Sequence, residues 1–359
     1  MKHRPLFPRE SVSRREFLRD TALATAGLAV SAKALAADPP ATKALNYNPD
    51  MEYRRLGRTG LMISAVCLGG HWKRIDTVVS GGGGIDHPDF RKNRYDVVSR
   101  CMERGLNYID ACTGSEVMVY SRALKGRRDK MHLGFSWFEE EMRNDNYRKA
   151  DKLLAALEKG MKQAGLDYVD LWRVTMNEQS GKHASTEVDE MMKALEKAKQ
   201  QGKARATGFS SHDRPHIKSM IESYPKVVDV IVTPYTSKSK ALPTDSVFDA
   251  LKQQDVGMFG IKPFASNSLF KGSSALDHAE AGEDSRRARM AIRYILNNPA
   301  VTAPIPGLIN LQQVDNVAKA VQERRQLDKS EQAELEKAAE EMWARLPENY
   351  QWLKDWEYV

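Results

Sequence analysis

Short apolar runs alternate along the chain with longer segments in which apolar residues recur at every third or fourth position. The runs have the length of buried strands, and the longer segments have the period of helices that bury one face. The eight apolar runs are Ile63–Leu68, Leu106–Ile109, Met131–Phe135, Tyr168–Val174, Ala204–Phe209, Val227–Thr233, Val256–Ile261 and Thr302–Ile305. The eight helical segments are Arg91–Arg104, Glu116–Leu124, Tyr147–Ala164, Thr186–Gln201, Arg214–Ser223, Thr244–Gln254, Arg286–Asn297 and Leu311–Gln322.

This alternation predicts an α/β fold with a parallel sheet, because parallel neighbours are joined by helical crossovers. Eight repeats predict that the sheet closes into a (β/α)8 TIM barrel, whose functional site lies at the C-terminal ends of the strands. An open doubly wound sheet is the alternative. That fold would carry a G-x-G-x-x-G turn after its first strand, and no such turn follows Leu68–His71.

Further elements flank the repeats or interrupt them. Glu52–Ser64 predicts an N-terminal β-hairpin around the turn Gly57–Gly60, and Lys329–Arg345 predicts an extra C-terminal helix. The glycines at 81–84 lack the Lys and Ser/Thr of a phosphate-binding loop, so they predict a flexible insertion at the barrel mouth. An aromatic tail ends the sequence, and we expect it to pack over the mouth or side of the barrel: Tyr350, Trp352, Trp356 and Tyr358.

The first 36 residues carry seven Lys/Arg and three Asp/Glu, a net charge of +4 out of the formal +7. The adjacent Arg14 and Arg15 precede an apolar run of small residues, Thr21–Ala32, and an A-x-A cleavage site at Ala34–Ala36. These three regions in order predict a twin-arginine signal peptide over residues 1–36, with the export machinery as partner and the periplasm as destination. The mature protein is then expected to keep no stable membrane span. A chance arginine pair before a cytoplasmic helix is the alternative.

Residues 37–50 are aperiodic and predict a linker, and residues 51–359 predict one barrel domain. Residues 37–359 carry only the remaining +3 of the formal net charge, which gives no reason to expect a nucleic-acid partner. The three cysteines, Cys67, Cys101 and Cys112, and the histidines have no metal-ligand spacing, so no metal site is predicted.

Six segments resemble, in order, motifs of the aldo-keto reductases: Tyr53–Leu61, Gly105–Asp110, Leu124–Lys130, Gly165–Leu171, Gly202–Ser210 and Asn298–Gly307. The resemblance implies a small-molecule substrate whose carbonyl is reduced with NADPH or NADH by an Asp, Tyr, Lys and His tetrad. Hydride reaches the carbonyl carbon while tyrosine protonates the oxygen. A lysine paired to the aspartate lowers the pKa of that tyrosine, and histidine orients the substrate.

Carried over by position, only the aspartate of this tetrad is present, as Asp110. No tyrosine occurs between Asp110 and Tyr120, and Ser136 and Thr175 stand where lysine and histidine are expected. The resemblance also implies cofactor contacts, with NADP or NAD left open because no basic residue follows Gly307 to pair with a 2′-phosphate. The implied cofactor-binding residues are Ser210, Ser211, Lys262, Gly307, Gln312, Asp315 and Asn316.

Two functions remain open. The first is an NAD(P)-dependent oxidoreductase acting on a carbonyl or sugar-like substrate with a non-standard site, in which His212 replaces the missing acid beside Asp110. The substrate pocket would then include Cys112, Ser136, Trp137, Thr175 and Asn177. The second is a catalytically silent exported barrel that binds a carbohydrate-like ligand, through residues such as Trp172 and Lys262, or a protein partner. Structural roles are the alternatives for both site residues. His212 would then cap the helix that follows it, and Asp110 would accept hydrogen bonds from backbone groups at a strand end.

Overall fold

The computed structural model describes residues 40, 43–79, 84–239, 245–272, 275 and 277–354. The chain divides into two units, residues 1–37 and 38–359, and every described residue belongs to the second unit. The predicted signal peptide with Arg14 and Arg15, the glycines at 81–83, and Trp356 and Tyr358 of the tail lie outside the described residues.

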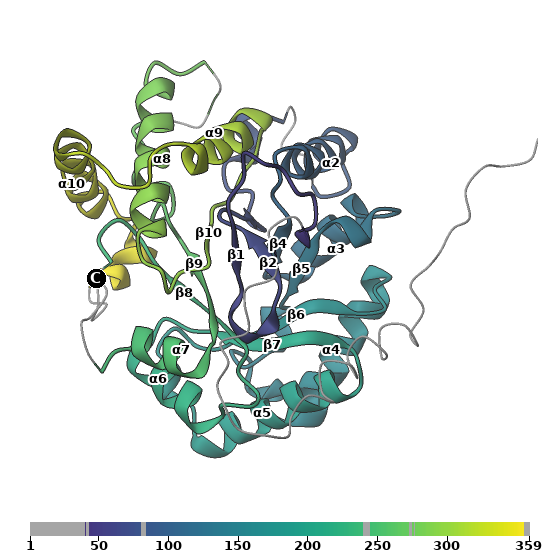
Figure 1. Cartoon of the computed structure of the whole chain (residues 1–359). Coiled ribbons are helices and arrows are strands. Elements are labelled where there is room, and N and C mark those ends of the chain that lie inside the picture. The colour runs from purple at the N-terminus through teal and green to yellow at the C-terminus, as the bar shows by residue number, and fades with distance from the viewer. Residues whose placement is uncertain are drawn as a thin grey trace, which may run out of the picture. The chain divides into compact units, whose positions relative to one another are not determined.

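Within the described residues, eight parallel strands form one sheet in sequence order, and this sheet closes on itself (Figure 1). The first and last strands join because the N–H groups of Cys67 and Gly69 donate to the carbonyls of Pro304 and Pro306, at 3.1 and 2.8 Å. The predicted (β/α)8 fold is confirmed. The strands are β3 (Leu68–Gly69), β4 (Tyr108–Ala111), β5 (His132–Phe135), β6 (Val169–Thr175), β7 (Ala204–Ser210), β8 (Val230–Pro234), β9 (Gly257–Ile261) and β10 (Ala303–Ile305).

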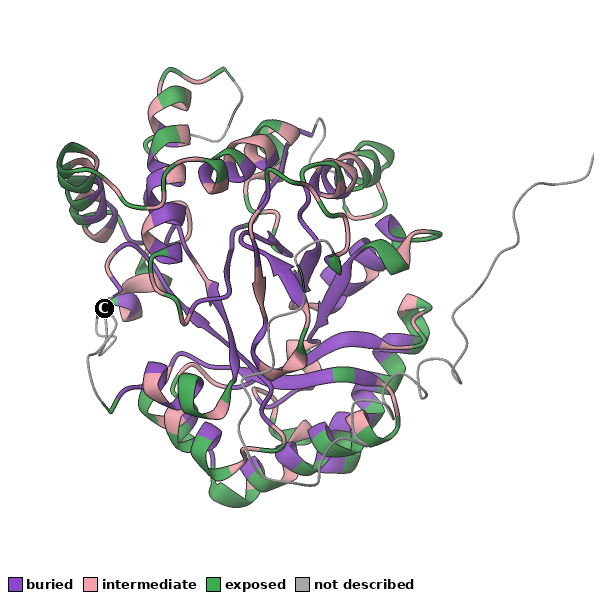
Figure 2. Cartoon of the chain, in the orientation of Figure 1, coloured by how far each residue is buried: buried purple, intermediate pink, exposed green. Residues whose placement is uncertain are grey.

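Helices surround the sheet and bury their apolar faces against it, while their outer faces are exposed (Figure 2). The predicted helices are all present, and two of them, α6 and α9, have the predicted bounds. Within the described residues the helices are α2 (Pro88–Glu103), α3 (Gly114–Ala123), α4 (Ala150–Ala164), α5 (Ser185–Gln200), α6 (Arg214–Ser223), α7 (Val247–Gln254), α8 (Ala281–Leu296), α9 (Leu311–Gln322) and α10 (Lys329–Ala344). None of the described helices is long and apolar enough to span a bilayer.

The predicted strand Ile63–Leu68 is wrong in its bounds. Its first residues belong to β2 (Met62–Ser64), which pairs with β1 (Tyr53–Arg55) in the predicted antiparallel hairpin, and the barrel strand is the shorter β3. Because the hairpin and the barrel strand are both buried, the apolar run continues across the bend between them. Periodicity alone therefore could not separate the two elements.

The hairpin closes the N-terminal end of the barrel. Leu56 and Ile63 join a fully buried cluster inside the sheet that also contains Tyr108 and Phe259. Gly57, at φ +48°, lets the turn approach the start of β9, since a Cβ there would lie 2.3 Å from the backbone nitrogen of Gly257. The interior of the barrel between the hairpin and the C-terminal ends of the strands is therefore filled by apolar side chains.

The described part of the predicted linker is not a free tether. The side-chain amide of Asn46 donates to the carbonyl of Lys130 at 2.6 Å, and that of Asn48 donates to the carbonyl of Glu103 at 3.1 Å. Ala44 is buried in the main core. Composition indicated a linker, but these asparagine amides bind carbonyls at the ends of other elements and fix residues 43–50 against the barrel.

Candidate functional site

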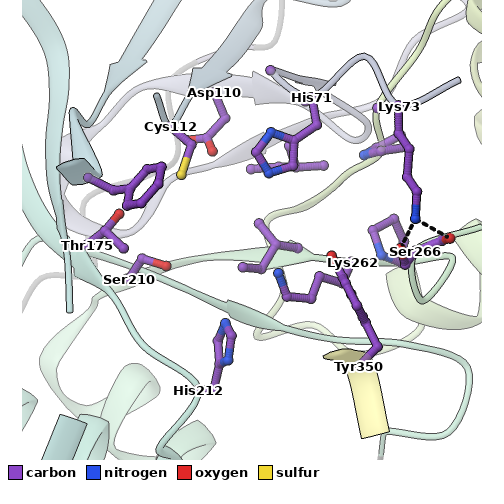
Figure 3. Close-up of a pocket in the computed structure, with 18 of the residues that line it drawn as sticks. His71, Lys73, Asp110, Cys112, Thr175, Ser210, His212, Lys262, Ser266 and Tyr350 are labelled. Carbon is purple, nitrogen blue, oxygen red and sulfur yellow. Dashed lines mark hydrogen bonds between the residues drawn. The ribbon is translucent and has the colours of Figure 1, made fainter. Parts of the chain in front are cut away.

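A cavity of 480 Å³ opens at the C-terminal ends of the strands (Figure 3). This is the end at which barrel proteins carry their functional groups, because the loops that follow the strands converge there. Of the residues predicted for the site, this cavity is lined by Asp110, Cys112, Thr175, Ser210, His212, Lys262 and Gly307.

An ion pair between Asp110 of β4 and Arg173 of β6 lies at the base of the cavity. The Arg173 Nε donates to Asp110 Oδ1 at 2.8 Å, and the terminal Nη2 donates to Oδ2. The two side chains are only 5% and 3% exposed. Burial by itself lowers the pKa of Arg173, but the facing Asp110 carboxylate outweighs it and holds that pKa well above the ordinary value. The guanidinium is therefore permanently charged and donates hydrogen bonds without supplying a proton.

Sequence reasoning missed Arg173, although a signal was present. The residue is a charge within the apolar run Tyr168–Val174, in a strand predicted to be buried on both faces. A buried charge needs a partner of opposite sign, and Asp110 was the acid already assigned to the same end of the barrel. Arg173 thus takes the partner position that the resemblance gave to a lysine.

No tyrosine of the barrel strands or of α3 faces the cavity in the described structure. The Tyr108 hydroxyl donates to Asp110 Oδ1 at 3.2 Å, but this ring is fully buried below the pocket and stacks on Phe259. Tyr120 lies on α3 and donates to the carbonyl of Gly70 at 3.1 Å, and burial raises its pKa to about 12. The one tyrosine among the described lining residues is Tyr350, from the C-terminal tail.

Ser136 and Thr175 meet, as converging strand ends require, but only Thr175 lines the cavity. Their hydroxyls lie 2.8 Å apart, and Ser136 also donates to the carboxylate of Glu141 at 2.6 Å. Glu141 accepts the Thr175 N–H at 2.7 Å as well. Burial raises the Glu141 pKa, while these hydrogen bonds oppose that rise. Glu141, which the sequence did not reveal, joins the ends of β5 and β6.

Trp137, Trp172 and Asn177 lie elsewhere than predicted. The Trp137 indole packs against Gly114 and Gly160, where added Cβ atoms would lie 2.2 and 2.6 Å from it, so it fills the space between α3 and α4. Trp172 is 1% exposed and belongs to the core. Asn177 lines a neighbouring open cavity. Successive side chains at a strand end point to opposite faces, so Ser136 and Trp137 could not both face inward.

His212 lines the cavity but is poorly suited to the predicted role of acid. Its ring is 7% exposed and stacks on Trp352 of the tail, with centroids 4.2 Å apart. Burial, with the positive charges of Lys262 and Arg143, holds its pKa well below the ordinary value. The ring is therefore neutral at neutral pH. It does not cap the next helix, because Asp213 performs that function for α6.

Cys112 lines the cavity as a neutral thiol. Burial raises its pKa, and the nearby Arg173 only partly opposes that rise. The thiolate needed for nucleophilic chemistry is accordingly disfavoured. The three cysteines form no disulfide, and no group of three or more His, Cys, Asp or Glu in the described residues is placed to hold a metal ion.

A second pair of polar groups lies at the mouth, formed by His71 and Glu116. His71 Nδ1 contacts Glu116 Oε1, and the other carboxylate oxygen accepts the N–H of Cys112 at 2.7 Å. The Glu116 side chain is 4% exposed, whereas that of His71 is 63% exposed. The sequence gave no sign of this pair, because the loop after β3 meets the start of α3 only in the folded barrel.

A second cavity, of 420 Å³, adjoins the first and shares the lining residues Lys73, Phe264, Asn267 and Gly307 with it. The first turns of α8 and α9 contribute to its wall. Of the three residues predicted to bind the adenine end of the cofactor, Gln312 and Asn316 line this cavity and Asp315 does not. The Asp315 carboxylate accepts a hydrogen bond at 2.7 Å from Arg104, the residue that follows α2.

Of the remaining predicted cofactor residues, Ser211 is directed away from the cavity, and its hydroxyl donates to Ser180 at 2.6 Å. Lys262 follows β9 with φ +58°, a left-handed conformation that is strained for a non-glycine residue. Its Nζ lies 5.4 Å from the Tyr350 ring centroid and 5.7 Å from that of Trp352. Within the described residues no carboxylate forms a salt bridge with it.

Known proteins share this architecture. A profile of the Aldo/keto reductase family matches residues 81–340, more than half of the chain. L-glyceraldehyde 3-phosphate reductase of Escherichia coli O157:H7 is 23% identical over 77% of this chain and 92% of its own. L-galactose dehydrogenase of Arabidopsis thaliana is 23% identical over 76% and 91%. The structure of the aldo-keto reductase AKR11C1 from Bacillus halodurans, in its holo form, matches with a TM-score of 0.59 and 21% identity over 80% and 96%.

We expect Arg173→Met to lower the free energy of unfolding by about 3–5 kcal/mol, because it leaves the Asp110 carboxylate buried without a counter-charge. The double variant Asp110→Leu/Arg173→Met removes both charges and should recover at least about 2 kcal/mol of that loss. Urea denaturation of the wild type, both single variants and the double variant measures this cycle. Strictly additive losses would contradict a direct coupling between the two side chains.

The buried His212 predicts a pH-dependent stability. Its folded pKa lies below the ordinary value of 6.5, so the unfolded chain binds more protons once the pH falls below that value. The free energy of unfolding should therefore decrease between about pH 6.5 and 5, by about 1–2 kcal/mol more in the wild type than in His212→Gln. His183 and His216 also have lowered pKa values. Because the wild type and His212→Gln both contain these two histidines, their contribution cancels in the comparison. Parallel stability curves from urea denaturation at each pH would refute the claim.

Proposed function

Because the chain belongs to the aldo/keto reductase family, we propose that it is an NAD(P)-dependent oxidoreductase whose site has been rebuilt around Asp110 and Arg173. The substrate is a carbonyl compound or a sugar-like alcohol. The observation that carries this proposal is the pair of adjoining cavities at the C-terminal ends of the strands. Together they provide one compartment for a reacting group and one for the distant end of a long ligand.

The residues of the two cavities fit a nicotinamide dinucleotide. Lys73 lines both cavities and supplies a positive charge where a pyrophosphate would cross between them. Phe264 and Phe270 give the second cavity apolar walls, and the amide of Gln312 adds hydrogen-bonding groups suited to an adenine base. The bound cofactor would supply or accept hydride in the first cavity.

The second cavity favours NADH over NADPH. A 2′-phosphate is normally matched by basic side chains, but Lys73 is the one Lys or Arg among the described residues that line this cavity. Asp284, which also lines it, accepts the backbone N–H groups of Lys271 and Gly272 at 2.8 Å and adds negative charge. We therefore expect NADH to bind at least as tightly as NADPH.

The chain's own residues would orient and polarise the substrate. Arg173 lines the first cavity with a fixed positive charge, which stabilises negative charge that develops on a carbonyl oxygen. The buried Asp110 holds that guanidinium in place. Tyr350 and Trp352 cover one side of the cavity beside Lys262 and would exclude water from the reacting atoms.

The names of the relatives support a sugar-like substrate. An L-glyceraldehyde 3-phosphate reductase and an L-galactose dehydrogenase both carry names of enzymes acting on sugars or their phosphates. In this chain the aromatic rings of Tyr350 and Trp352 provide a surface on which a sugar ring stacks, and Lys262 provides a charge for an anionic substituent.

Cofactor binding tests this function. NADH and NADPH are titrated into the mature protein, which begins at Ala37, and tryptophan fluorescence is followed, since Trp352 lines the first cavity. We expect micromolar affinity for NADH. Lys73→Gln should weaken it by about tenfold through loss of a phosphate contact, which is about 1.4 kcal/mol. Lys125→Gln changes an exposed lysine in the turn after α3 that lines neither cavity, so it is the matched control and should leave affinity unchanged.

Absence of binding by both cofactors, up to millimolar concentrations, would reject this function. The outcome would favour the catalytically silent barrel that binds a carbohydrate-like ligand or a protein partner. Binding of NADPH alone would reject only the preference for NADH.

We also propose that the twin-arginine pathway exports the protein to the periplasm, on the basis of the arginine pair and the apolar run that follows it. Arg14→Lys/Arg15→Lys keeps the charge of the leader but removes the pair. We expect this variant to remain in the cytoplasm with its leader uncleaved, as measured by cell fractionation and mass spectrometry. An undiminished periplasmic fraction would exclude this route.

A further inference from the structure

The pair formed by His71 and Glu116 has the geometry of an oriented acid–base group. Glu116 is held at both carboxylate oxygens, by the N–H of Cys112 at 2.7 Å and by Nδ1 of His71. A buried carboxylate at Nδ1 keeps a hydrogen on that nitrogen, because a carboxylate only accepts. The other ring nitrogen, Nε2, makes no hydrogen bond within the described residues and belongs to a side chain that is 63% exposed.

The backbone of His71 is fixed by closure of the barrel. Gly69 donates its N–H to the Pro306 carbonyl at 2.8 Å, and Gly307 passes so close that a Cβ there would lie 2.5 Å from the His71 carbonyl oxygen. The ring therefore enters the cavity from a rigid point beside the first strand. Figure 3 shows it on the same side of the pocket as Asp110 and Cys112.

Three other groups that line the cavity are poor proton donors. His212 is buried and neutral, the Cys112 thiol is disfavoured as an anion, and Arg173 does not release its proton. Histidine is the side chain that ordinarily changes charge near neutral pH. The charged or titratable groups that line the cavity with His71 are Lys73, Asp110, Cys112, Glu116, Arg173, His212, Lys262 and Tyr350. Arg143 and Glu178, also in the lining, pair with each other at 2.8 Å.

We propose that Nε2 of His71 is the proton donor when a carbonyl is reduced and the proton acceptor in the reverse reaction, with Glu116 as its positioning residue. This inference rests on the proposed function. In reduction, the carbonyl carbon accepts hydride from the cofactor, which is oxidised, and the π electron pair moves onto the oxygen. That oxygen takes the Nε2 proton, the ring becomes neutral with its hydrogen on Nδ1, and solvent returns a proton to Nε2.

The first test needs neither cofactor nor substrate. Histidine ring nitrogens are labelled with nitrogen-15, the His71 signals are assigned with His71→Asn, and the tautomer of the neutral ring is read from the nitrogen chemical shifts. We expect hydrogen on Nδ1 in the wild type and loss of that preference in Glu116→Gln. His87, a partly exposed histidine that caps α2, is the internal reference. Hydrogen on Nε2 in the wild type would overturn the proposal.

The second test separates proton transfer from cofactor binding. His71→Asn should bind NADH within about twofold of the wild type, yet reduce L-glyceraldehyde and 4-nitrobenzaldehyde about 100- to 10,000-fold more slowly. The pH dependence of kcat should lose an ionisation in this variant. Glu116→Gln should show a smaller loss, and His87→Asn, which keeps a good helix cap, should lose nothing.

The outcomes distinguish the two claims. A wild type that binds neither cofactor rejects the proposed function, whatever the tautomer of His71. A wild type that binds NADH and reduces either aldehyde, with His71→Asn equally fast, rejects His71 alone. If the wild type binds NADH but reduces neither aldehyde, the nitrogen signals decide whether the proposal for His71 stands. Support then requires hydrogen on Nδ1 of His71, and NADH must shift the His71 signals while leaving those of His87 unchanged. A His71 signal that NADH leaves unmoved would overturn the proposal.

Discussion

The buried ion pair between Asp110 and Arg173 is the constraint around which the pocket is built. Either charge alone would be strongly unfavourable inside the barrel, so each fixes the other, and the ends of β4 and β6 are fixed with them. Arg173 also donates to the Thr175 hydroxyl at 3.1 Å, which continues the network to Ser136 and the buried Glu141. The same ion pair leaves Arg173 permanently charged, so the proton that the proposed reaction requires would come from another group.

The mouth is assembled from segments that are distant in sequence. The loop after β3 contributes His71, the start of α3 contributes Glu116, and the tail contributes Tyr350 and Trp352. Trp352 stacks on His212 and so helps to remove that ring from water, which is the cause of its lowered pKa. Contact with Trp352 of the tail thus helps to keep His212 neutral, whereas His71 stays in contact with solvent and is oriented by the Glu116 carboxylate. The different environments of these two histidines therefore result from packing and not from residue type.

The sequence predicted the elements far better than the site. The barrel strands and the covering helices were predicted because burial imposes a period on apolar residues. Several strand bounds differ by two or three residues, and the predicted strand Ile63–Leu68 crosses two separate buried elements. For the site, Asp110, Thr175 and Lys262 line the cavity, since each lies at the C-terminal end of a strand or directly after it. Trp137 was misplaced because neighbouring side chains at a strand end face opposite ways.

The sequence itself determines the order of strands and helices, because that order follows from residue type and spacing along the chain. The residue types at the positions aligned with the tetrad are also read from the sequence, which has Ser136 and Thr175 where the resemblance expects lysine and histidine. Which charges meet, and which histidine is buried, was decided only by the tertiary structure. Arg173 reaches Asp110 across β5, and Glu116 at the start of α3 reaches His71 in the loop that follows the neighbouring strand β3. Ion pairing and desolvation depend on distances in three dimensions, and no pattern along the chain encodes them.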